Sequence, residues 1–456
     1  MNNVTMDKLV ALCKGRGFVF AGSDIYGGLA NSWDYGPLGI ELKNNIQREW
    51  WKFFVQEAEN SVGLDAGILM HPRVWEASGH VGGFSDPLMD CKGCKTRHRA
   101  DNLIDVSSKG AVSGDGWTHE QMQKYIDEKK LGCPNCGKRD WTPIRNFNLM
   151  FKTHRGVTED SNSVIYLRPE TAQGQYVNFQ NVQRSMRLKL PFGIGQVGKA
   201  FRNEITPGNF IFRTLEFEQL EHQLFCRKED AKKFYLEYKK KIWDFYVERL
   251  GIDVAGLRYQ DHENLVFYAK AAVDMQYKFC FGWKEINGTH HRSDYDLTQH
   301  TKFSGKDQSY TDPVTNEKFI PTVIESSMGL TRALLVVLHD AYREEKLDDG
   351  EIRVVLKLKP SLAPYKVAVL PLQKKDLTDK SREVYRNLSR HFMVTYDDTA
   401  SIGKRYRRQD EIGTPFCVTV DYDTLNDGCV TVRARDSMKQ ERVELSSLVS
   451  YLEALL

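Results

Sequence analysis

The fold is decided by two runs of sequence on either side of a short loop: Phe201-Arg202-Asn203-Glu204 and Phe212-Arg213-Thr214-Leu215-Glu216-Phe217-Glu218-Gln219-Leu220-Glu221. They predict a β-hairpin, in which alternate residues point to opposite faces. Arg202 and Glu204 then share one face, and Phe217, Gln219 and Glu221 share one face of the return strand. Because a guanidinium can fork onto a phosphate and a ring can stack on a base, this sheet surface suits a nucleotide. A ladder of cross-strand ion pairs on a solvated sheet is the alternative interpretation.

A second run, Glu325-Ser326-Ser327-Met328-Gly329-Leu330-Thr331-Arg332, precedes the apolar stretch Ala333–Leu338. This order predicts a strand, a turn of small residues and a buried helix. Arg332 lies in the first turn of that helix, where the helix dipole disfavours a cation. A bound anion would explain its position, and a snorkelling arginine beside a capping segment is the alternative.

The surrounding patterns predict an antiparallel α+β domain. Leu42, Ile46 and Trp50 recur at helical spacing within an amphipathic helix over 40–59, which is followed by a strand that ends at Pro72. Short strands are predicted over 164–225 and a strand over 279–286. A helix is predicted over 231–250, and a strand leading into a buried helix over 323–337. Several strands in succession with attached helices are typical of this fold class.

The last hundred residues predict a separate, small α/β domain. Strands alternate there with helices, which indicates a parallel or mixed sheet. We expect strands at 366–370, 416–421 and 430–435 and helices at 381–391 and 445–456. The stretch Lys359–Pro364 contains two prolines and is the expected linker.

Composition excludes several classes of protein. The chain has 456 residues, which suggests about three domains. Its 64 basic and 61 acidic residues give a net charge of +3, unlike a polybasic tail or an acidic solvating domain. The apolar stretch 333–338 is too short to span a bilayer, and the N-terminus lacks an apolar signal core. We therefore expect a cytoplasmic protein.

Cysteine spacing predicts a zinc site rather than disulfides. Nine cysteines in so long a chain do not make a disulfide scaffold. Four of them form two Cys-x2-Cys turns, at Cys91 and Cys94 and at Cys133 and Cys136, which suit a tetrahedral thiolate site. Four ordinary thiols are the alternative.

These motifs resemble those of class II aminoacyl-tRNA synthetases. The 40–59 helix with its strand resembles the first class motif, usually a dimer interface, while 201–221 resembles the second and 325–332 the third. Ser327 and Thr331 depart from the general class pattern and fit the homodimeric glycyl-tRNA synthetases. Further stretches resemble that group: Trp33–Gly39, Arg168–Gly174, Ala363–Leu372 and Ser401–Tyr406.

The resemblance implies a class II catalytic domain at 1–360, with a Cys-rich insertion at about 86–160, and an anticodon-binding domain at 361–456. The implied reaction is ATP-dependent ligation of glycine to tRNA-Gly through a glycyl-adenylate. The implied partners are ATP with Mg²⁺, glycine, tRNA-Gly and a second copy of the chain. Two alternatives stay open: a synthetase for another small amino acid, and a non-catalytic, synthetase-like accessory protein that binds nucleic acid.

For the nucleotide, the resemblance assigns Arg202 to the α-phosphate and the glycine carboxylate, Glu204 to the adenine amino group and Phe217 to the adenine ring. Arg213 and Arg332 would hold the outer phosphates. Glu285 would hold Mg²⁺, a hard cation that prefers oxygen ligands. Arg202 and Arg332 are the implied catalytic residues. The implied ATP-binding set is Arg202, Asn203, Glu204, Phe212, Arg213, Thr214, Leu215, Glu216, Phe217, Glu285, Ile286, Gly329, Leu330, Thr331 and Arg332.

For glycine, the resemblance implies several carboxylates around the ammonium group. The implied set is Arg99, Glu170, Phe217, Glu218, Gln219, Leu220, Glu221, Arg292, Glu325, Ser326, Ser327, Met328 and Gly329. For tRNA, a basic cluster around Tyr406 would attract phosphates. It contains Lys404, Arg405, Arg407, Arg408, Arg433 and Arg435.

Overall fold

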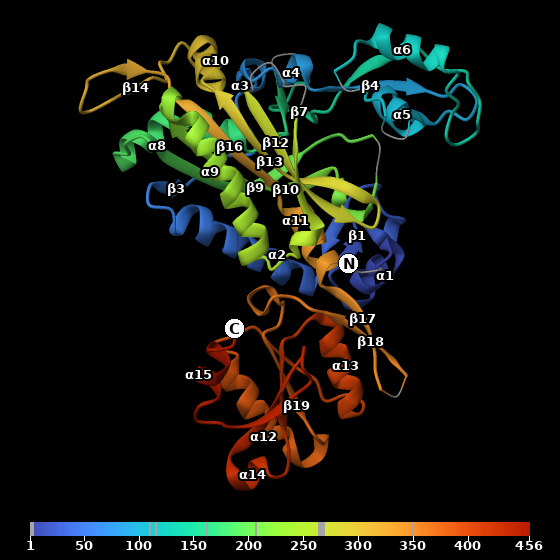
Figure 1. Cartoon of the computed structure of the whole chain (residues 1–456), viewed down its shortest axis with the longest axis vertical. Coiled ribbons are helices and arrows are strands. Elements are labelled where there is room, and N and C mark those ends of the chain that lie inside the picture. The colour runs from blue at the N-terminus through green and yellow to red at the C-terminus, as the bar shows by residue number, and fades with distance from the viewer. Residues whose placement is uncertain are drawn as a thin grey trace.

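The computed structural model has a larger body above and a smaller C-terminal domain below (Figure 1). It describes every residue except 1–3, 109–110, 115, 161–162, 206–207, 263–269 and 349. Residues 206 and 207, in the loop of the predicted hairpin, therefore lie outside the described part. No described helix is both long enough and apolar enough to cross a membrane.

A seven-stranded sheet forms the centre of the body, in the order β11-β12-β13-β16-β10-β9-β3. Its neighbouring strands are antiparallel except for β3, which pairs parallel with β9. The strands span Leu257–Asp261 (β11), Ala271–Phe279 (β12), Gly282–Ser293 (β13), Thr322–Gly329 (β16), Glu216–Cys226 (β10), Phe192–Phe201 (β9) and Ser61–Gly63 (β3). The predicted antiparallel α+β domain is confirmed.

The sheet has one apolar and one polar face, because its strands alternate their side chains. Leu220, Ile286 and Met328 point to the apolar face and join the main core, which α2 and α11 also enter. The helix α9 covers the same face beside Ile324. These helices span Pro37–Trp51 (α2), Ala231–Asp244 (α9) and Leu330–Ala341 (α11). The opposite, polar face is left for the site.

The first class motif differs in detail from its prediction. The helix α2 continues through a π-helical turn over Lys52–Gln56, whereas the strand expected to reach Pro72 is only the short β3. Trp50 and Phe54 are fully buried inside the protomer, and Phe53 packs against the guanidinium of Arg249. The aromatic side chains of Trp50, Phe53 and Phe54 are therefore covered by their own chain and give no independent argument for a dimer.

The Cys-rich insertion folds at one corner of the body, around its own small core. Its elements span Ser85–Asp90 (β4), Arg97–Arg99 (β5), Ala100–Ser107 (α5), His119–Glu128 (α6) and Arg145–Asn148 (β6). The remaining elements of the body are Met6–Arg16 (α1), Val19–Ala21 (β1), Trp33–Tyr35 (β2), Arg73–Ala77 (α3), His80–Gly83 (α4), Lys152–His154 (β7), Val164–Tyr166 (β8), Ala172–Val177 (α7), Phe179–Met186 (α8), Tyr295–Ser304 (α10), Tyr310–Thr311 (β14), Lys318–Phe319 (β15), Tyr342–Lys346 (β17) and Ile352–Leu356 (β18).

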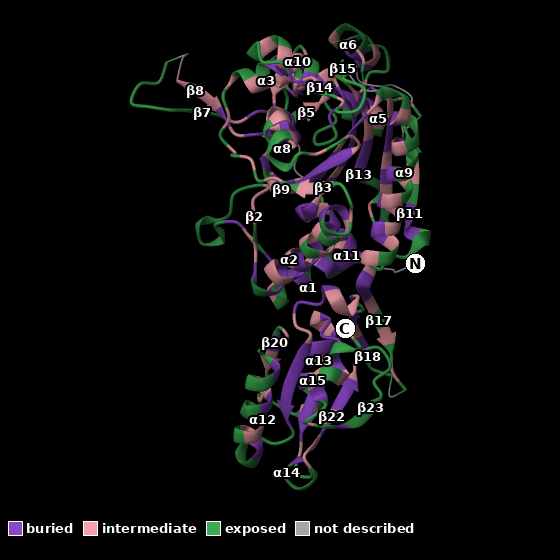
Figure 2. Ribbon diagram, turned by 90° about the vertical axis from the view of Figure 1, so that its left-hand side faces the viewer, coloured by how far each residue is buried: buried purple, intermediate pink, exposed green. Residues whose placement is uncertain are grey.

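The C-terminal domain is a mixed five-stranded sheet in the order β20-β19-β21-β22-β23, as the α/β pattern predicted. Its interior is almost entirely buried (Figure 2). The sequence did not predict β20, α13, α14 or β23. The elements span Val367–Pro371 (β19), Lys374–Leu388 (α12), Val394–Tyr396 (β20), Ile402–Ile412 (α13), Phe416–Val420 (β21), Thr424–Asp427 (α14), Cys429–Ala434 (β22), Gln440–Glu444 (β23) and Leu448–Glu453 (α15).

Three of the six residues of the basic cluster predicted in this domain are buried, whereas Lys404 is exposed and Arg407 and Arg408 are half-buried. Arg405, Arg433 and Arg435 are at most 5% exposed. Arg433 pairs with Asp410 at 2.9 Å, and the guanidinium of Arg435 donates to main-chain carbonyls and Asp436. These arginines hold the domain together because a buried cation must be paired or hydrogen-bonded.

Candidate active site

The register of three strands builds the polar floor. Glu221 of β10 lies directly opposite Ser327 of β16, and Gln219 lies opposite Gly329. Gly288 of β13 lies on the other side of Ser327. Residues directly opposite one another share a face of the sheet, so the predicted alternation in β10 brings Phe217, Gln219 and Glu221 together.

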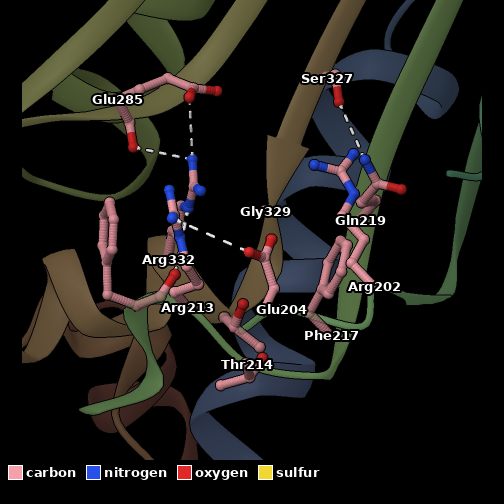
Figure 3. A pocket seen from close by; sticks show the side chains of 12 residues that line it. Arg202, Glu204, Arg213, Thr214, Phe217, Gln219, Glu285, Ser327, Gly329 and Arg332 are labelled. Carbon is pink, nitrogen blue, oxygen red and sulfur yellow. Dashed lines mark hydrogen bonds and ion pairs between the residues drawn. The ribbon is translucent and has the colours of Figure 1, made fainter. Parts of the chain in front are cut away.

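One end of this floor is a pocket whose lining combines rings, guanidinium groups and carboxylates (Figure 3). Arg202 and Glu204 both reach it, but from the loop after β9 rather than from the strand. The Arg202 Nε donates to the carbonyl of Pro169 at 3.1 Å. The complete lining is Arg202, Glu204, Phe212, Arg213, Thr214, Phe217, Gln219, Glu285, Ser327, Gly329, Thr331 and Arg332.

Two aromatic rings hold the guanidinium of Arg202. Its central carbon lies 5.2 Å from the ring centre of Phe84 and 5.4 Å from that of Phe217. Such cation–π contacts fix a charged group without consuming its hydrogen-bond donors. The remaining donors of Arg202 can therefore turn toward an anion in the pocket.

Two further arginines of the pocket pair with carboxylates at its edge, and Arg332 also donates to the main-chain carbonyls of Phe212 and Glu285. Arg332, in the first turn of α11, lies 3.2 Å from Glu285 and 4.6 Å from the ring centre of Phe212. Arg213 lies 3.9 Å from Glu204. Burial acts to raise the pKa of Glu285, but the charge of Arg332 outweighs it and lowers that pKa. A cationic first turn and these loose pairs suit a polyphosphate.

The other end of the floor gathers three carboxylates: Glu170, Glu221 and Glu325. The Glu221 side chain accepts from Thr171 at 2.5 Å, Ser327 at 2.7 Å and Gln219 at 3.0 Å. Glu325 accepts from Gln223 at 3.0 Å. Gln173 donates to Glu170 at 2.9 Å. Every group is thus held in one orientation by neutral donors.

Cations near this cluster balance its charge only partly. Arg292 lies 3.1 Å from Glu325 and 2.8 Å from Asp296. Although burial opposes both shifts, Arg292 lowers the pKa of Glu325, and His80 and Arg292 lower that of Glu170. Burial and repulsion from the other two carboxylates raise the pKa of Glu221 to about 7. A cluster with this excess of negative charge attracts a cationic ligand.

Several residues of the predicted sets do not line these pockets. Alternation turns Glu218 toward Lys43 at 2.6 Å and places Leu220, Met328 and Leu330 in the core. Arg99 pairs with Asp86 and Asp101 in a separate polar cavity of about 360 Å³, which the pocket meets at Arg213. The other members outside both the pocket lining and the carboxylate cluster are Asn203, Leu215, Glu216, Ile286 and Ser326.

Some residues that contact the carboxylates were not predicted. His290 lies 2.9 Å from Glu325, opposite it in the sheet. Thr171 contacts Glu221, and His80 lies 3.4 Å from Glu170. Period-two alternation places His290 on the same strand face as Arg292 but does not show which residue of the neighbouring strand it meets. Only the pairing of β13 with β16 reveals the contact.

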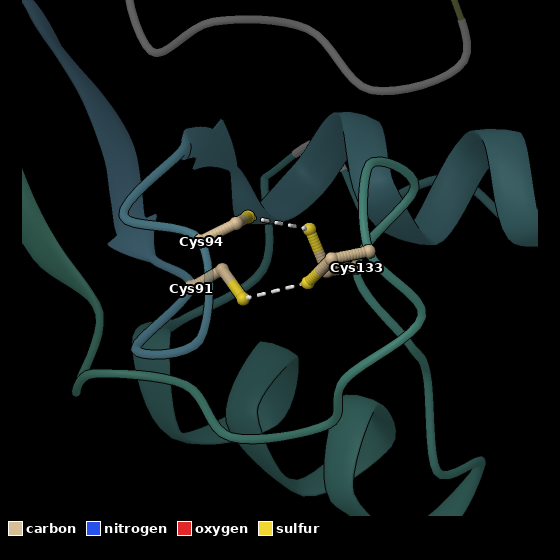
Figure 4. A group of neighbouring side chains, drawn as sticks. Cys91, Cys94 and Cys133 are labelled. Atoms are coloured by element: carbon tan, nitrogen blue, oxygen red, sulfur yellow. Dashed lines mark hydrogen bonds between the residues drawn. The ribbon is translucent and has the colours of Figure 1, made fainter.

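The two Cys-x2-Cys turns meet as predicted (Figure 4). The four sulfur atoms all lie within 4.8 Å of one another, with Cys91 to Cys136 and Cys94 to Cys133 each at 3.6 Å. Four thiolates around Zn²⁺ at 2.3 Å would be about 3.8 Å apart. A hydrogen bond from Thr96 lowers the pKa of the Cys94 thiol to about 6. The donor set therefore fits zinc.

Family models match both parts of the chain. The tRNA synthetase class II core domain (G, H, P, S and T) matches residues 151–341, and the anticodon binding domain matches residues 366–455. Together with an antiparallel sheet that carries an arginine-rich pocket, they define a class II aminoacyl-tRNA synthetase. The fold class predicted from the sequence is thereby confirmed.

Relatives narrow this class to one amino acid. The chain is 59% identical to the glycine–tRNA ligase of Clostridium acetobutylicum over 455 residues, which cover 98% of each chain. It is 58% identical to that of Alkaliphilus oremlandii and 57% to that of Clostridium perfringens, again over 98% of each chain. The chain belongs to the glycine–tRNA ligase family.

The protein is therefore an enzyme that ligates glycine to tRNA, as the sequence predicted. Membership of this family implies ATP, glycine and tRNA-Gly as substrates and Mg²⁺ with the ATP. The two alternatives, a synthetase for another amino acid and a non-catalytic accessory protein, are set aside by similarity that extends over the whole chain.

Proposed function

We propose that the pocket of Figure 3 binds ATP and that the carboxylate cluster beside it binds the ammonium group of glycine. One observation carries this assignment. Gln219 and Ser327 both line the pocket, and both donate hydrogen bonds to Glu221. The two subsites therefore adjoin on one sheet face, where the α-phosphate and the glycine carboxylate can meet.

In this arrangement Arg202 orients the reacting groups. A glycine carboxylate oxygen attacks the α-phosphorus, a new P–O bond forms, and the bond to the β-phosphate oxygen breaks to release diphosphate. The carboxylate is already an anion at neutral pH, so no general base is needed. Arg202 stabilises charge on the α-phosphate because the rings of Phe84 and Phe217 hold its guanidinium in place.

The nucleotide contacts follow from the same geometry. Phe217 stacks on the adenine and Glu204 accepts from its amino group. Arg213 and Arg332 exchange their carboxylate partners for the outer phosphates. Glu285 is half exposed at the pocket edge and would hold Mg²⁺, which neutralises phosphate charge when bound.

Selectivity for glycine rests on the fixed carboxylates. Glu170, Glu221 and Glu325 receive the ammonium group, with Arg292 and Ser327 holding them in place. A pocket rejects one extra methyl by only about 1–3 kcal/mol when its wall can yield. Every carboxylate here is tied by at least two partners, so the wall is rigid.

The remaining assignments concern the assembly. We propose that Cys91, Cys94, Cys133 and Cys136 bind a structural zinc ion in an insertion at about 86–160. We further propose a cytoplasmic homodimer, on the resemblance of the 40–59 segment to the first class motif. The division into a catalytic domain over 1–360 and an anticodon-binding domain over 361–456 is supported by two separate cores, one of buried residues up to Leu362 and one of buried residues from Val367 onward.

The decisive test is glycine-dependent exchange of diphosphate into ATP. Replacing Arg202 by Ala should reduce exchange at least 100-fold while the protein stays folded. His154→Ala, on the exposed hairpin β7–β8, is the control and should retain full exchange. Near-normal exchange by a folded Arg202→Ala protein would contradict the assignment.

The anticodon proposal needs a full-length test. Deleting 361–456 would leave the fully buried Arg353 of β18 without Asp410, so loss of activity could reflect misfolding. A charge reversal at the exposed Lys404 and half-buried Arg407 avoids this problem. The double variant should activate glycine normally but charge tRNA-Gly with a higher KM for tRNA. Unchanged charging would remove these residues from the tRNA contact.

A further inference from the structure

His80 lies between the two halves of the site. It begins α4, and its Nε2 is 3.4 Å from a carboxylate oxygen of Glu170. Its Nδ1 is 2.8 Å from the hydroxyl of Ser78. The rings of Trp75 and Phe84 meet the imidazole edge-on, with centres at 5.6 and 5.2 Å. Two polar contacts and two aromatic contacts thus fix the orientation of the imidazole ring.

The proton of His80 is fixed by its partners. Because an ionised carboxylate only accepts hydrogen bonds, Nε2 must carry a proton to face Glu170. Nδ1 then accepts from the Ser78 hydroxyl when the ring is neutral, or donates to it when the ring is charged. In both states the ring presents a donor to Glu170, so the contact persists whichever charge the ring carries.

The same ring also adjoins the reacting centre. Phe84, which contacts His80 on one side, lies under the guanidinium of Arg202 on the other. Glu170 is therefore linked to Arg202 by a continuous row of contacts through His80 and Phe84. A shift of the Glu170 side chain toward His80 would press on these packed rings. This position distinguishes His80 from a histidine that merely fills the core.

We propose that His80 is a positioning residue for glycine recognition, which holds the carboxylate of Glu170 toward the ammonium group through its Nε2–H. The inference rests on the proposed role of Glu170. His80 is not one of the residues proposed to contact glycine. It acts through the carboxylate of Glu170, and the sequence did not predict it as a site residue. Its removal should weaken glycine binding rather than ATP binding.

Two amide variants separate the hydrogen bond from simple packing. Gln can place its amide nitrogen near the position of Nε2, whereas Asn reaches only the position of Nδ1. We expect His80→Leu and His80→Asn to raise the KM for glycine about tenfold or more, with the KM for ATP changed less than twofold. His80→Gln should recover most of the wild-type glycine KM. These constants are measured by diphosphate exchange on the full-length protein.

Two further variants make each outcome decisive. Combining His80→Leu with Glu170→Gln should raise the glycine KM no more than Glu170→Gln alone, because both changes remove one interaction. An unchanged glycine KM in folded His80→Leu, or equal KM values for the Gln and Asn variants, would overturn the inference. If Glu170→Gln itself leaves the glycine KM unchanged, the proposed glycine subsite is wrong instead.

Discussion

Two clusters of buried charge in this molecule have opposite designs. At the junction with the C-terminal domain, Arg353 and Arg433 share Asp410, and Arg353 also contacts Glu345 at 2.8 Å. The two positive and two negative groups of this cluster balance one another. In the proposed glycine subsite, the carboxylates of Glu170, Glu221, Glu325 and Asp296 outnumber the two guanidinium groups near them, those of Arg292 and Arg168, and His80 and His290 lie at the edge.

The difference shows how structural and functional charges can be told apart. A buried pair whose charges cancel needs nothing further and holds two elements together, here β18 and α13. A buried group whose charges do not cancel is destabilised until a ligand of the opposite sign arrives, and this is where the pKa of Glu221 rises to about 7. Substitutions in the two clusters should therefore have different, and partly opposite, effects.

The largest effect on stability is expected at the junction. Replacing Asp410 by Asn keeps its volume but leaves the buried guanidinium of Arg433 without its carboxylate partner, and it removes one of the two carboxylates that contact Arg353. Breaking a buried pair in this way costs about 3–5 kcal/mol, so thermal unfolding of the C-terminal domain should begin at a clearly lower temperature. Glycine-dependent exchange below that temperature should be retained. An unfolding curve equal to that of the wild type would mean that water reaches this cluster.

The carboxylate cluster should respond in the opposite way. Glu221→Gln removes one repelling charge, so in the absence of glycine the variant should unfold no more easily than the wild type at pH 8. It also removes a partner of the ammonium group, which should raise the KM for glycine about 10- to 100-fold, as expected for loss of a charged hydrogen bond. Exchange kinetics with varied glycine test this expectation. A large loss of stability together with an unchanged KM would make Glu221 a structural residue.

Stability should also depend on pH through Glu221. Its pKa is 4.5 in the unfolded chain and about 7 in the folded one, so the folded protein holds the proton more tightly. The stabilisation from this proton is complete below about pH 4.5 and is lost as pH rises through about 7, by at most about 3 kcal/mol. Denaturant titrations of wild type and Glu221→Gln should therefore diverge between pH 5 and 8, and parallel curves would contradict the shift.

Binding should follow the same titration with the reverse sign. The ammonium group of glycine needs the ionised carboxylate, so the wild-type KM for glycine should fall as pH rises from about 6 to 8. In Glu221→Gln this slope should be weaker, whereas Asp410→Asn should keep it. Exchange assays at saturating ATP measure the profile. A slope that survives in Glu221→Gln would assign the titration to another group.

The sequence predicted the alternation on β10 because a strand has a strict period of two, so Phe217, Gln219 and Glu221 had to share a face. It also predicted the sulfur cluster, because two short turns leave their thiols little choice of direction. It could not show that Arg433 and Arg435 are buried, since their partners, Asp410 of α13 and the carbonyl of Leu358, are brought to them only by the tertiary fold. The partners of His80 and His290 likewise come from distant segments that only the tertiary fold brings together.

The smallest effect is expected one residue away from the largest. Glu411 follows Asp410 on α13 and pairs with Arg16 of α1, but both side chains are partly exposed, at 24% and 39%. Exposed ion pairs contribute about 0–1 kcal/mol, and salt screens them. Glu411→Gln should therefore shift unfolding only slightly and less still at high salt, whereas the deficit of Asp410→Asn should persist. Because both substitutions act on one helix and remove one negative charge, the difference between them isolates burial as the cause. If both shifts were of similar size, the junction cluster would be as open to water as the surface pair beside it, and its balanced charges would no longer explain its stability.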